Sequence, residues 1–308
     1  MTAMRGVRFI SAAIAAVALA PFALLACHGR SSSNVDAAAT VSPQAGPPPS
    51  APANAIPVPL ASVEKYVNPQ KLPAYDGPTG SVEGTVRIDG PEPRNLPGRD
   101  FAKCPAAADV YGKSYREGPP GPDGTRPLGD ALVAVTGYSG FYIPERKEAV
   151  PVTVNDCAMG IRTVAMTFGQ RIEFASKLHE IFVPTFTQVG SPALMISNSL
   201  TEPVKLYPPR PGYFTLLDGS QSHPYASIDV YALLHPLHAV TDLQGHFRID
   251  GVPVGKLKVD ARLAAVQRNA VADVEVHAGV VEHVDLVIHA PTVPAGFLPD
   301  GGVPKWVK

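Results

Sequence analysis

The chain predicts an all-β protein built of two β-sandwiches. Residues 81–88 alternate apolar and polar side chains, and similar short runs recur up to residue 289. Gly, Pro and Asn separate these runs, and no amphipathic helix longer than three turns stands out among them. The 308 residues, with 34 prolines and 27 glycines, suffice for two domains rich in turns.

The first and central strands follow from local patterns. Residues 81–88 end at the turn Asp89-Gly90, and residues 131–135 form a continuous apolar run that predicts a buried strand. Further short strands are expected at residues 168–174, 181–183, 193–196 and 213–217.

The last strands show the clearest alternation. In residues 273–277 and 281–289 one parity is apolar, comprising Val274, Val276, Val284, Leu286 and Ile288. A turn at residues 278–280 joins the two runs. The opposite parity carries His277, His283 and His289, which are therefore predicted to face solvent rather than to bind metal.

The N-terminus predicts a targeting segment. Arg5 and Arg8 precede an apolar run at residues 9–25, which ends in Leu24-Leu25-Ala26-Cys27 and resembles a bacterial lipobox. The resemblance implies cleavage after residue 26 and lipidation of Cys27, with His28 next to it implying the outer membrane, facing the periplasm or the cell surface. The alternative is an ordinary secretory signal with an unmodified cysteine.

Low-complexity sequence flanks the predicted folded part. Residues 27–79 are rich in Pro, Ala and Ser and are expected to form a disordered tether, with the folded part beginning near Gly80. Residues 291–308 are expected to form a C-terminal tail.

Charge and motifs argue against several functions. A net charge of -1 offers no basic field for nucleic acid. His179-Glu180 is not followed by a second histidine, since Val183 stands at that position, so no zinc-protease helix is present. The chain also lacks a Gly-x-Ser-x-Gly elbow and a phosphate-binding loop, and is predicted not to be an enzyme.

The segment Thr241-Asp242 with Gly245, Phe247 and Pro253 resembles the Thr-Asp-x-x-Gly-x-Phe and Val-Pro-x-Gly pattern of carboxypeptidase regulatory-like domains. The resemblance implies a prealbumin-like sandwich formed by residues 80–95 and 236–290, interrupted by an insert at residues 96–235. Such modules are non-catalytic and are associated with carbohydrate binding, so a protein or carbohydrate ligand is expected.

The segment His223-Pro224-Tyr225 resembles the C-terminal copper loop of cupredoxins, which implies a cupredoxin-like Greek key for residues 96–235. Ser220 stands at the cysteine position and Ala226 at the methionine position, so the thiolate of a blue-copper site is missing. The resemblance would bring His179 and His223 together as ligands for copper or zinc. Oxygen from Glu180, Asp218 or Ser220 could complete such a site.

Two cysteines remain after Cys27. Cys104 and Cys157 form an even pair in an exported protein, which predicts a disulfide that would stabilise the fold by about 4 kcal/mol in the chain-entropy model. Metal ligation by both is the alternative, but no Cys-x2-Cys spacing supports it. His235, His238 and His246 flank turns or strand ends and are predicted at the surface.

These observations together predict a membrane-anchored, extracytoplasmic lipoprotein that acts as a non-catalytic binding or structural module without a cofactor. The alternative is a metal-binding or electron-transfer protein with a remodelled site that uses His179 and His223.

Overall fold

The computed structural model of the protein describes residues 57–96, 101–189 and 195–291. The prediction of an all-β fold is confirmed, because these residues form sixteen strands and only two short α-helices, α1 (Leu60–Val67) and α2 (Pro105–Tyr111). Within the described residues, no helix is long and apolar enough to cross a membrane. The predicted signal peptide, Cys27 and residues 292–308 lie outside the described residues.

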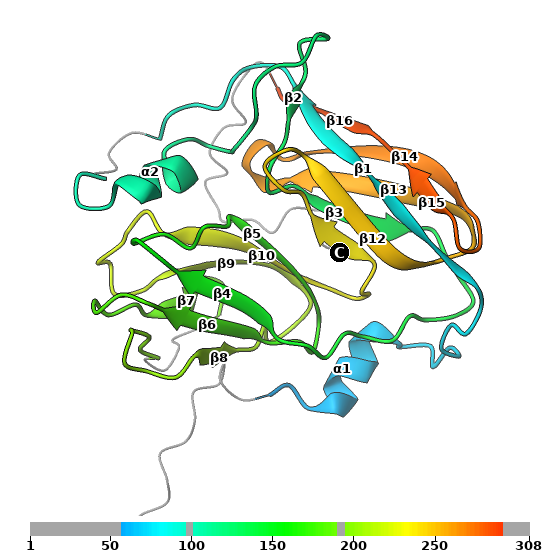
Figure 1. Ribbon diagram of the computed structural model, residues 1–308. Coiled ribbons are helices and arrows are strands. Elements are labelled where there is room, and N and C mark those ends of the chain that lie inside the picture. Colours follow the sequence, from blue (N-terminus) through cyan, green and yellow to red (C-terminus); the bar gives the residue numbers. More distant parts are fainter. Residues whose placement is uncertain (1–56, 97–100, 190–194, 292–308) are drawn as a thin grey trace, which may run out of the picture. The chain divides into compact units, whose positions relative to one another are not determined.

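The first sandwich encloses a core rich in aromatic side chains, among them Phe174, Phe182 and Phe214. Its larger sheet has the order β5-β10-β9-β7, and its smaller sheet the order β4-β6-β8 (Figure 1). The strands of the larger sheet are β5 (Thr163–Thr167), β10 (Ser227–Leu233), β9 (Gly212–Asp218) and β7 (Pro184–Phe186). Those of the smaller sheet are β4 (Val150–Val154), β6 (Ile172–Ser176) and β8 (Val204–Leu206).

The second sandwich has an aliphatic core, which contains Val82, Val133 and Ile288. One sheet is centred on β1 (Thr79–Asp89) and contains β2 (Arg126–Pro127), β12 (His246–Pro253), β15 (Val281–His283) and β16 (Leu286–His289). The other sheet has the order β11 (His238–Val240), β3 (Leu132–Thr136), β13 (Gly255–Leu263) and β14 (Arg268–Val276). A short 3-10 helix, η2 (Ala264–Val266), links β13 to β14.

Strand β1 is the strand with which all the others in its sheet pair. It pairs antiparallel with β12 and parallel with β15 and β16, so residues separated by up to 200 positions share one sheet. The predicted parity is confirmed at Val276, Val284, Leu286 and Ile288, which are all buried. Alternation along a strand places every second side chain on the core face, and the sequence shows that pattern directly.

A tight turn at residues 242–245 precedes β12. Oδ1 of Asp242 accepts hydrogen bonds from the backbone N–H groups of Gln244 and His246, at 2.9 and 2.8 Å. Gly245 adopts φ +80°, which glycine reaches without a steric penalty. The preceding Thr241 hydroxyl donates to the Leu128 carbonyl, which ties the turn to the neighbouring loop.

The segment Arg126–Thr136 differs from the predicted division of the chain. The sequence places it in the insert of residues 96–235, whereas β2 pairs with β1 and β3 pairs with β13, both in the second sandwich. The apolar run at residues 131–135 predicts a buried strand. It does not predict which strands pair with it, because those strands lie far away in the sequence.

The predicted tether is also wrong for its last part, because residues 57–79 include helix α1. Val63 of this helix is buried, and the Tyr66 ring contacts the Phe168 ring edge-on at 5.4 Å. Gly169 lies at the contact, where an added Cβ would stand 3.0 Å from the Val63 side chain. Val63 and Tyr66 dock the helix, and backbone hydrogen bonds of Pro73 and Tyr75 with Tyr142 hold the following residues.

Several short strands are shifted from their predicted positions. The run at residues 181–183 precedes β7, and Phe182 forms only an isolated bridge to Ser197. Strand β6 begins at Ile172, after a turn at Gly169 with φ +103°. Residues 193 and 194 lie outside the described residues, and residues 195 and 196 form no strand.

Candidate functional site

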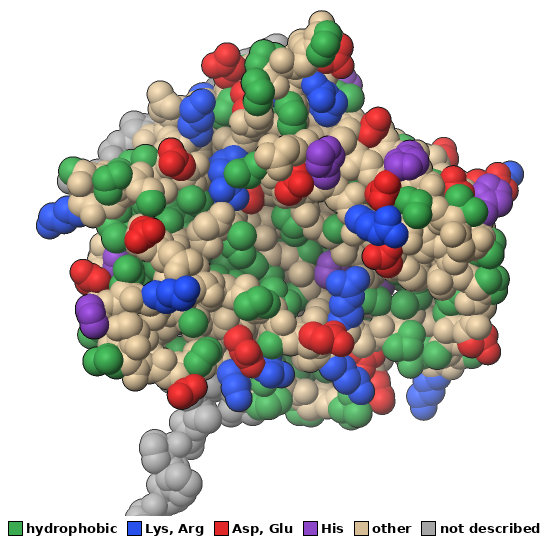
Figure 2. Space-filling view, viewed as in Figure 1, with side chains coloured by type: hydrophobic (Ala, Val, Ile, Leu, Met, Phe, Trp, Pro, Cys, Tyr) green, Lys and Arg blue, Asp and Glu red, His purple; other side chains and the backbone are tan. Residues whose placement is uncertain are grey.

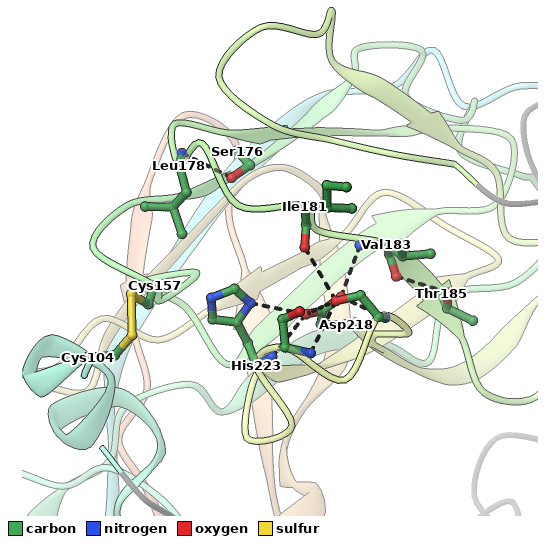
Figure 3. A network of polar contacts seen from close by, with 11 residues as sticks. Cys104, Cys157, Ser176, Leu178, Ile181, Val183, Thr185, Asp218 and His223 are labelled. Carbon is green, nitrogen blue, oxygen red and sulfur yellow. Dashed lines mark hydrogen bonds and ion pairs between the residues drawn. A yellow bond between two sulfur atoms is a disulfide. The ribbon is translucent and has the colours of Figure 1, made fainter. Parts of the chain in front are cut away.

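The loop between β9 and β10 forms the centre of the candidate site. It leaves β9 at Asp218, turns at Gln221, whose φ is +63°, and closes with a hydrogen bond from the Ala226 N–H to the His223 carbonyl at 2.9 Å. The tight turn directs the His223 side chain inward, where it is only 5% exposed (Figure 3).

The carboxylate of Asp218 organises this loop. Its Oδ1 accepts from the N–H groups of Val183 and Ser220, each at 3.0 Å. Its Oδ2 accepts from the Ser220 hydroxyl at 2.8 Å and from the His223 N–H at 3.1 Å. Because a buried carboxylate is stable only when its oxygens are paired, these donors fix Asp218 in one position.

The imidazole of His223 lies between this carboxylate and an aromatic wall. Its Nδ1 is 3.1 Å from Oδ2 of Asp218, and its ring stacks on Phe182 with centroids 4.5 Å apart. The Tyr225 ring contacts it edge-on at 6.2 Å. Since a carboxylate only accepts hydrogen bonds, the neutral ring carries its proton on Nδ1, which leaves the lone pair of Nε2 directed away from Asp218.

A disulfide faces the other side of this imidazole. Cys104, just before α2, is bonded to Cys157, and their Cα atoms are 5.7 Å apart. Cys157 stands with Asp156 at the centre of a tight turn after β4, at φ +62° and +44°. The sulfurs and a ring nitrogen of His223 all lie within 4.8 Å of one another, and the free ring nitrogen points towards the disulfide in Figure 3.

The surrounding aromatic side chains carry no charge at neutral pH. Burial raises the pKa of the Tyr111 hydroxyl to about 12, and this hydroxyl accepts a hydrogen bond from the Met159 N–H at 3.2 Å. Burial, together with the nearby Asp218, raises the pKa of Tyr225. The imidazole and the disulfide therefore share a largely apolar enclosure.

The predicted ligands of a copper loop are distributed differently. His179 is exposed, and its Nδ1 lies 3.1 Å from Oγ of Ser199. Among the described residues, the cluster of potential metal ligands joins His223 to the two cysteines and does not include His179. Ser220 uses its hydroxyl on Asp218, Ala226 is buried in the core, and Glu180 is exposed.

The remaining histidines divide into two groups. His277, His283 and His289 are exposed as predicted, and the side chain of His246 is 63% exposed. The prediction is wrong for His238, which is buried with Nε2 3.4 Å from Oγ1 of Thr167, and His235 is half-buried. His238 faces inward because β11 pairs with β3. The proline next to the predicted strand end indicates a turn but not which strand lies alongside.

No family model matches the chain, and no curated protein matches it. The chemistry of the site accordingly rests on its own geometry. With the disulfide closed, the site presents one imidazole nitrogen in an apolar enclosure, whereas zinc and copper centres use three or four protein ligands. The position of Cys104 and Cys157 beside His223 could not be predicted, because no spacing motif connects these residues.

Proposed function

We propose that the protein is a lipid-anchored, extracytoplasmic binding module that performs no catalysis of its own. The observation that carries this proposal is the loop at residues 220–226, in which the groups at the copper-ligand positions serve the fold. Ser220 holds Asp218, Ala226 packs in the core, and His223 is held by the same carboxylate. The lipobox-like Leu24-Leu25-Ala26-Cys27 supports anchoring at the outer membrane through Cys27.

The disulfide supports the proposed extracytoplasmic location. Bonds such as Cys104–Cys157 persist in oxidising environments and are rare where glutathione keeps thiols reduced. The charge distribution supports a partner other than nucleic acid, since Figure 2 shows acidic and basic side chains interspersed over the visible face. The module would therefore face the periplasm or the cell surface.

A cavity of about 280 Å³ between β3, β13 and β10 is the proposed ligand site. Leu132, Ala134 and Leu233 give it an apolar wall, His235 contributes an imidazole, and the ion pair of Asp260 and Arg262 forms a polar edge. Nδ1 of His235 is buried and has no hydrogen-bond partner among the described residues. Burial lowers the pKa of this ring to about 4, so it is neutral at pH 7. Because Asp260 and Arg262 pair with each other, the cavity suits a small ligand that is uncharged and largely apolar.

Electron transfer through His179 and His223 is the competing function, and a copper titration separates the two. The oxidised wild-type chain with added Cu(II) is expected to show no intense thiolate-to-copper band, because the loop offers no thiolate. Ser220→Cys combined with Ala226→Met supplies the missing ligands and tests whether the loop has the copper-loop geometry. A strong band in the wild-type protein would refute the proposal.

Anchoring and binding are tested separately. Cys27→Ser is expected to move the chain from the membrane fraction to the soluble fraction, and retention in the membrane would exclude lipidation. For binding, Ala134→Trp fills the cavity and is expected to abolish capture of small apolar molecules from native membranes, which mass spectrometry of the purified protein detects. Val271→Trp adds the same side chain at an exposed position of β14 and serves as the control. Equal capture by both variants would place the binding site elsewhere.

A further inference from the structure

Three potential metal ligands meet at one point in the first sandwich. Cys104 precedes α2, Cys157 lies in the turn after β4, and His223 lies in the loop after β9. One ligand atom from each lies within 4.8 Å of the other two. Zn–S bonds of about 2.3 Å and Zn–N bonds of about 2.0–2.1 Å place the ligand atoms of a tetrahedral site roughly 3.5–3.8 Å apart. The upper limit of 4.8 Å encompasses that requirement, and the two bonded sulfurs must move apart to reach it.

The imidazole is already oriented as a metal ligand. Metal-binding histidines usually donate their second ring N–H to a carboxylate, which fixes both the tautomer and the ring position. Asp218 accepts from Nδ1 of His223 in this way at 3.1 Å, and the carboxylate is itself held by Val183 and Ser220. The lone pair of Nε2 consequently faces the sulfurs without rotation of the ring (Figure 3).

The enclosure also suits a thiolate site. Cys104 and His223 are buried, while Cys157 is half-buried and gives access to the bond from one side. Phe182 and Tyr225 line the imidazole, and neither is charged at neutral pH. Exclusion of water strengthens the attraction between a divalent cation and two thiolates.

We propose that the disulfide closes a redox-gated metal site, and that its reduction creates a Cys104–Cys157–His223 centre for Zn²⁺. A dithiol reductant attacks the bond, and two electrons and two protons convert the cystine into two thiols while the reductant becomes a cyclic disulfide. Zn²⁺ then displaces both thiol protons to solvent and binds two thiolates and Nε2 of His223. A water molecule completes the tetrahedron. In the oxidised protein both sulfurs are bonded to each other, so the site is closed.

The proposed metal site is separate from the proposed binding function. It is tested on the reduced protein, whereas the copper titration uses the oxidised protein. The experiment uses the full chain with Cys27→Ser, which leaves Cys104 and Cys157 as the only cysteines. The chain is reduced with a dithiol, freed of reductant without oxygen, and titrated with Zn²⁺ against a coloured chelator. One tightly bound Zn²⁺ per reduced chain is expected, and none in the oxidised chain. Co²⁺ should give thiolate charge-transfer bands in the reduced chain alone.

Matched variants assign the ligands. Asp218→Asn is expected to weaken Zn²⁺ binding by about 10–100-fold, as removal of a carboxylate behind a histidine ligand usually does. His223→Gln removes the ligand itself and is expected to weaken binding further. His179→Ala changes an exposed histidine outside the cluster and should leave the affinity unchanged.

Three results would overturn the proposal. The reduced chain could bind no more Zn²⁺ than the oxidised chain, or His223→Gln could retain the wild-type affinity, which would indicate a dithiolate alone. The third is loss of the β-sheet circular dichroism on reduction without recovery when Zn²⁺ is added. The copper titration of the oxidised protein is independent of all three, so failure of one proposal is distinguishable from failure of the other.

Discussion

At the scale of single residues, His238 shows how burial changes the chemistry of a side chain. Burial lowers its pKa to about 3, and the positive charge of Arg146 acts in the same direction. An imidazole in an unfolded chain titrates near 6.5, so between about pH 6.5 and pH 3 the unfolded chain binds one proton more than the folded chain. The stability that a neutral His238 provides is complete above that range and is lost as the pH falls.

This difference predicts a pH dependence of stability. Between about pH 6 and pH 4.5, the free energy of unfolding should fall by up to about 1.4 kcal/mol per pH unit for this residue. His238→Gln removes the titration and keeps a polar group near Thr167, so urea unfolding of this variant should show a shallower slope than the wild type. His246→Gln, at an exposed position, is the control. Parallel slopes for wild type and His238→Gln would contradict the prediction.

At the scale of elements, Gly84 sets how closely β1 approaches the end of the chain. A Cβ added to Gly84 would lie 1.9 Å from the carbonyl oxygen of Val284, between β15 and β16. At the next residue of β1, the hydroxyl and the backbone N–H of Thr85 both donate hydrogen bonds to Asp285, at 2.6 and 2.9 Å. The last two strands can therefore pair with β1 only where residue 84 has no side chain.

Gly84→Ala is accordingly expected to destabilise the protein. The clash involves backbone on both sides and cannot be relieved by rotating a side chain, so the loss should be about 3 kcal/mol. Chemical denaturation of the purified variant measures it. Thr79→Ala lies at the exposed start of the same strand and should change stability by less than about 0.5 kcal/mol. Equal effects of the two substitutions would exclude the close approach as the cause.

Elements with a local signal were predictable from the sequence, and their partners were not. The alternation around Val284, Leu286 and Ile288 placed their side chains correctly, because strand periodicity is a local property. That β3 belongs with β13, that His238 turns inward and that Cys157 meets His223 all depend on pairing between distant segments. Such pairing is selected by the packed core as a whole, which no short pattern encodes.

At the scale of the whole molecule, Asp130 joins the two sandwiches. It precedes β3 and binds Arg116 through two hydrogen bonds of 2.7 Å, while its Oδ1 accepts from the Arg162 N–H at 3.2 Å. Its carbonyl accepts from the Thr163 hydroxyl, at the start of β5, at 2.8 Å. Because this ion pair is largely buried, removal of one charge leaves the other without compensation.

Asp130→Asn is therefore expected to lower the free energy of unfolding by about 3 kcal/mol. Asparagine tolerates the φ of +63° at this position, so the substitution tests the charge rather than the backbone. We expect the two sandwiches to unfold in one calorimetric transition in the wild type and to separate into two transitions in the variant. Asp273→Asn breaks the exposed pair with Lys258 and should have little effect. A similar loss of stability in both variants would show that the charge of Asp130 does not connect the two sandwiches.

The pairing of β1 also has a consequence in time. Thr85 and Asp285 are 200 positions apart, and at roughly 5–20 residues per second about 10–40 s of synthesis separate them. During that interval β1 exists without the two parallel strands that will cover it. An uncovered strand presents unpaired backbone groups to any neighbouring chain. Until β15 and β16 arrive, the newly made protein is therefore open to aggregation through β1.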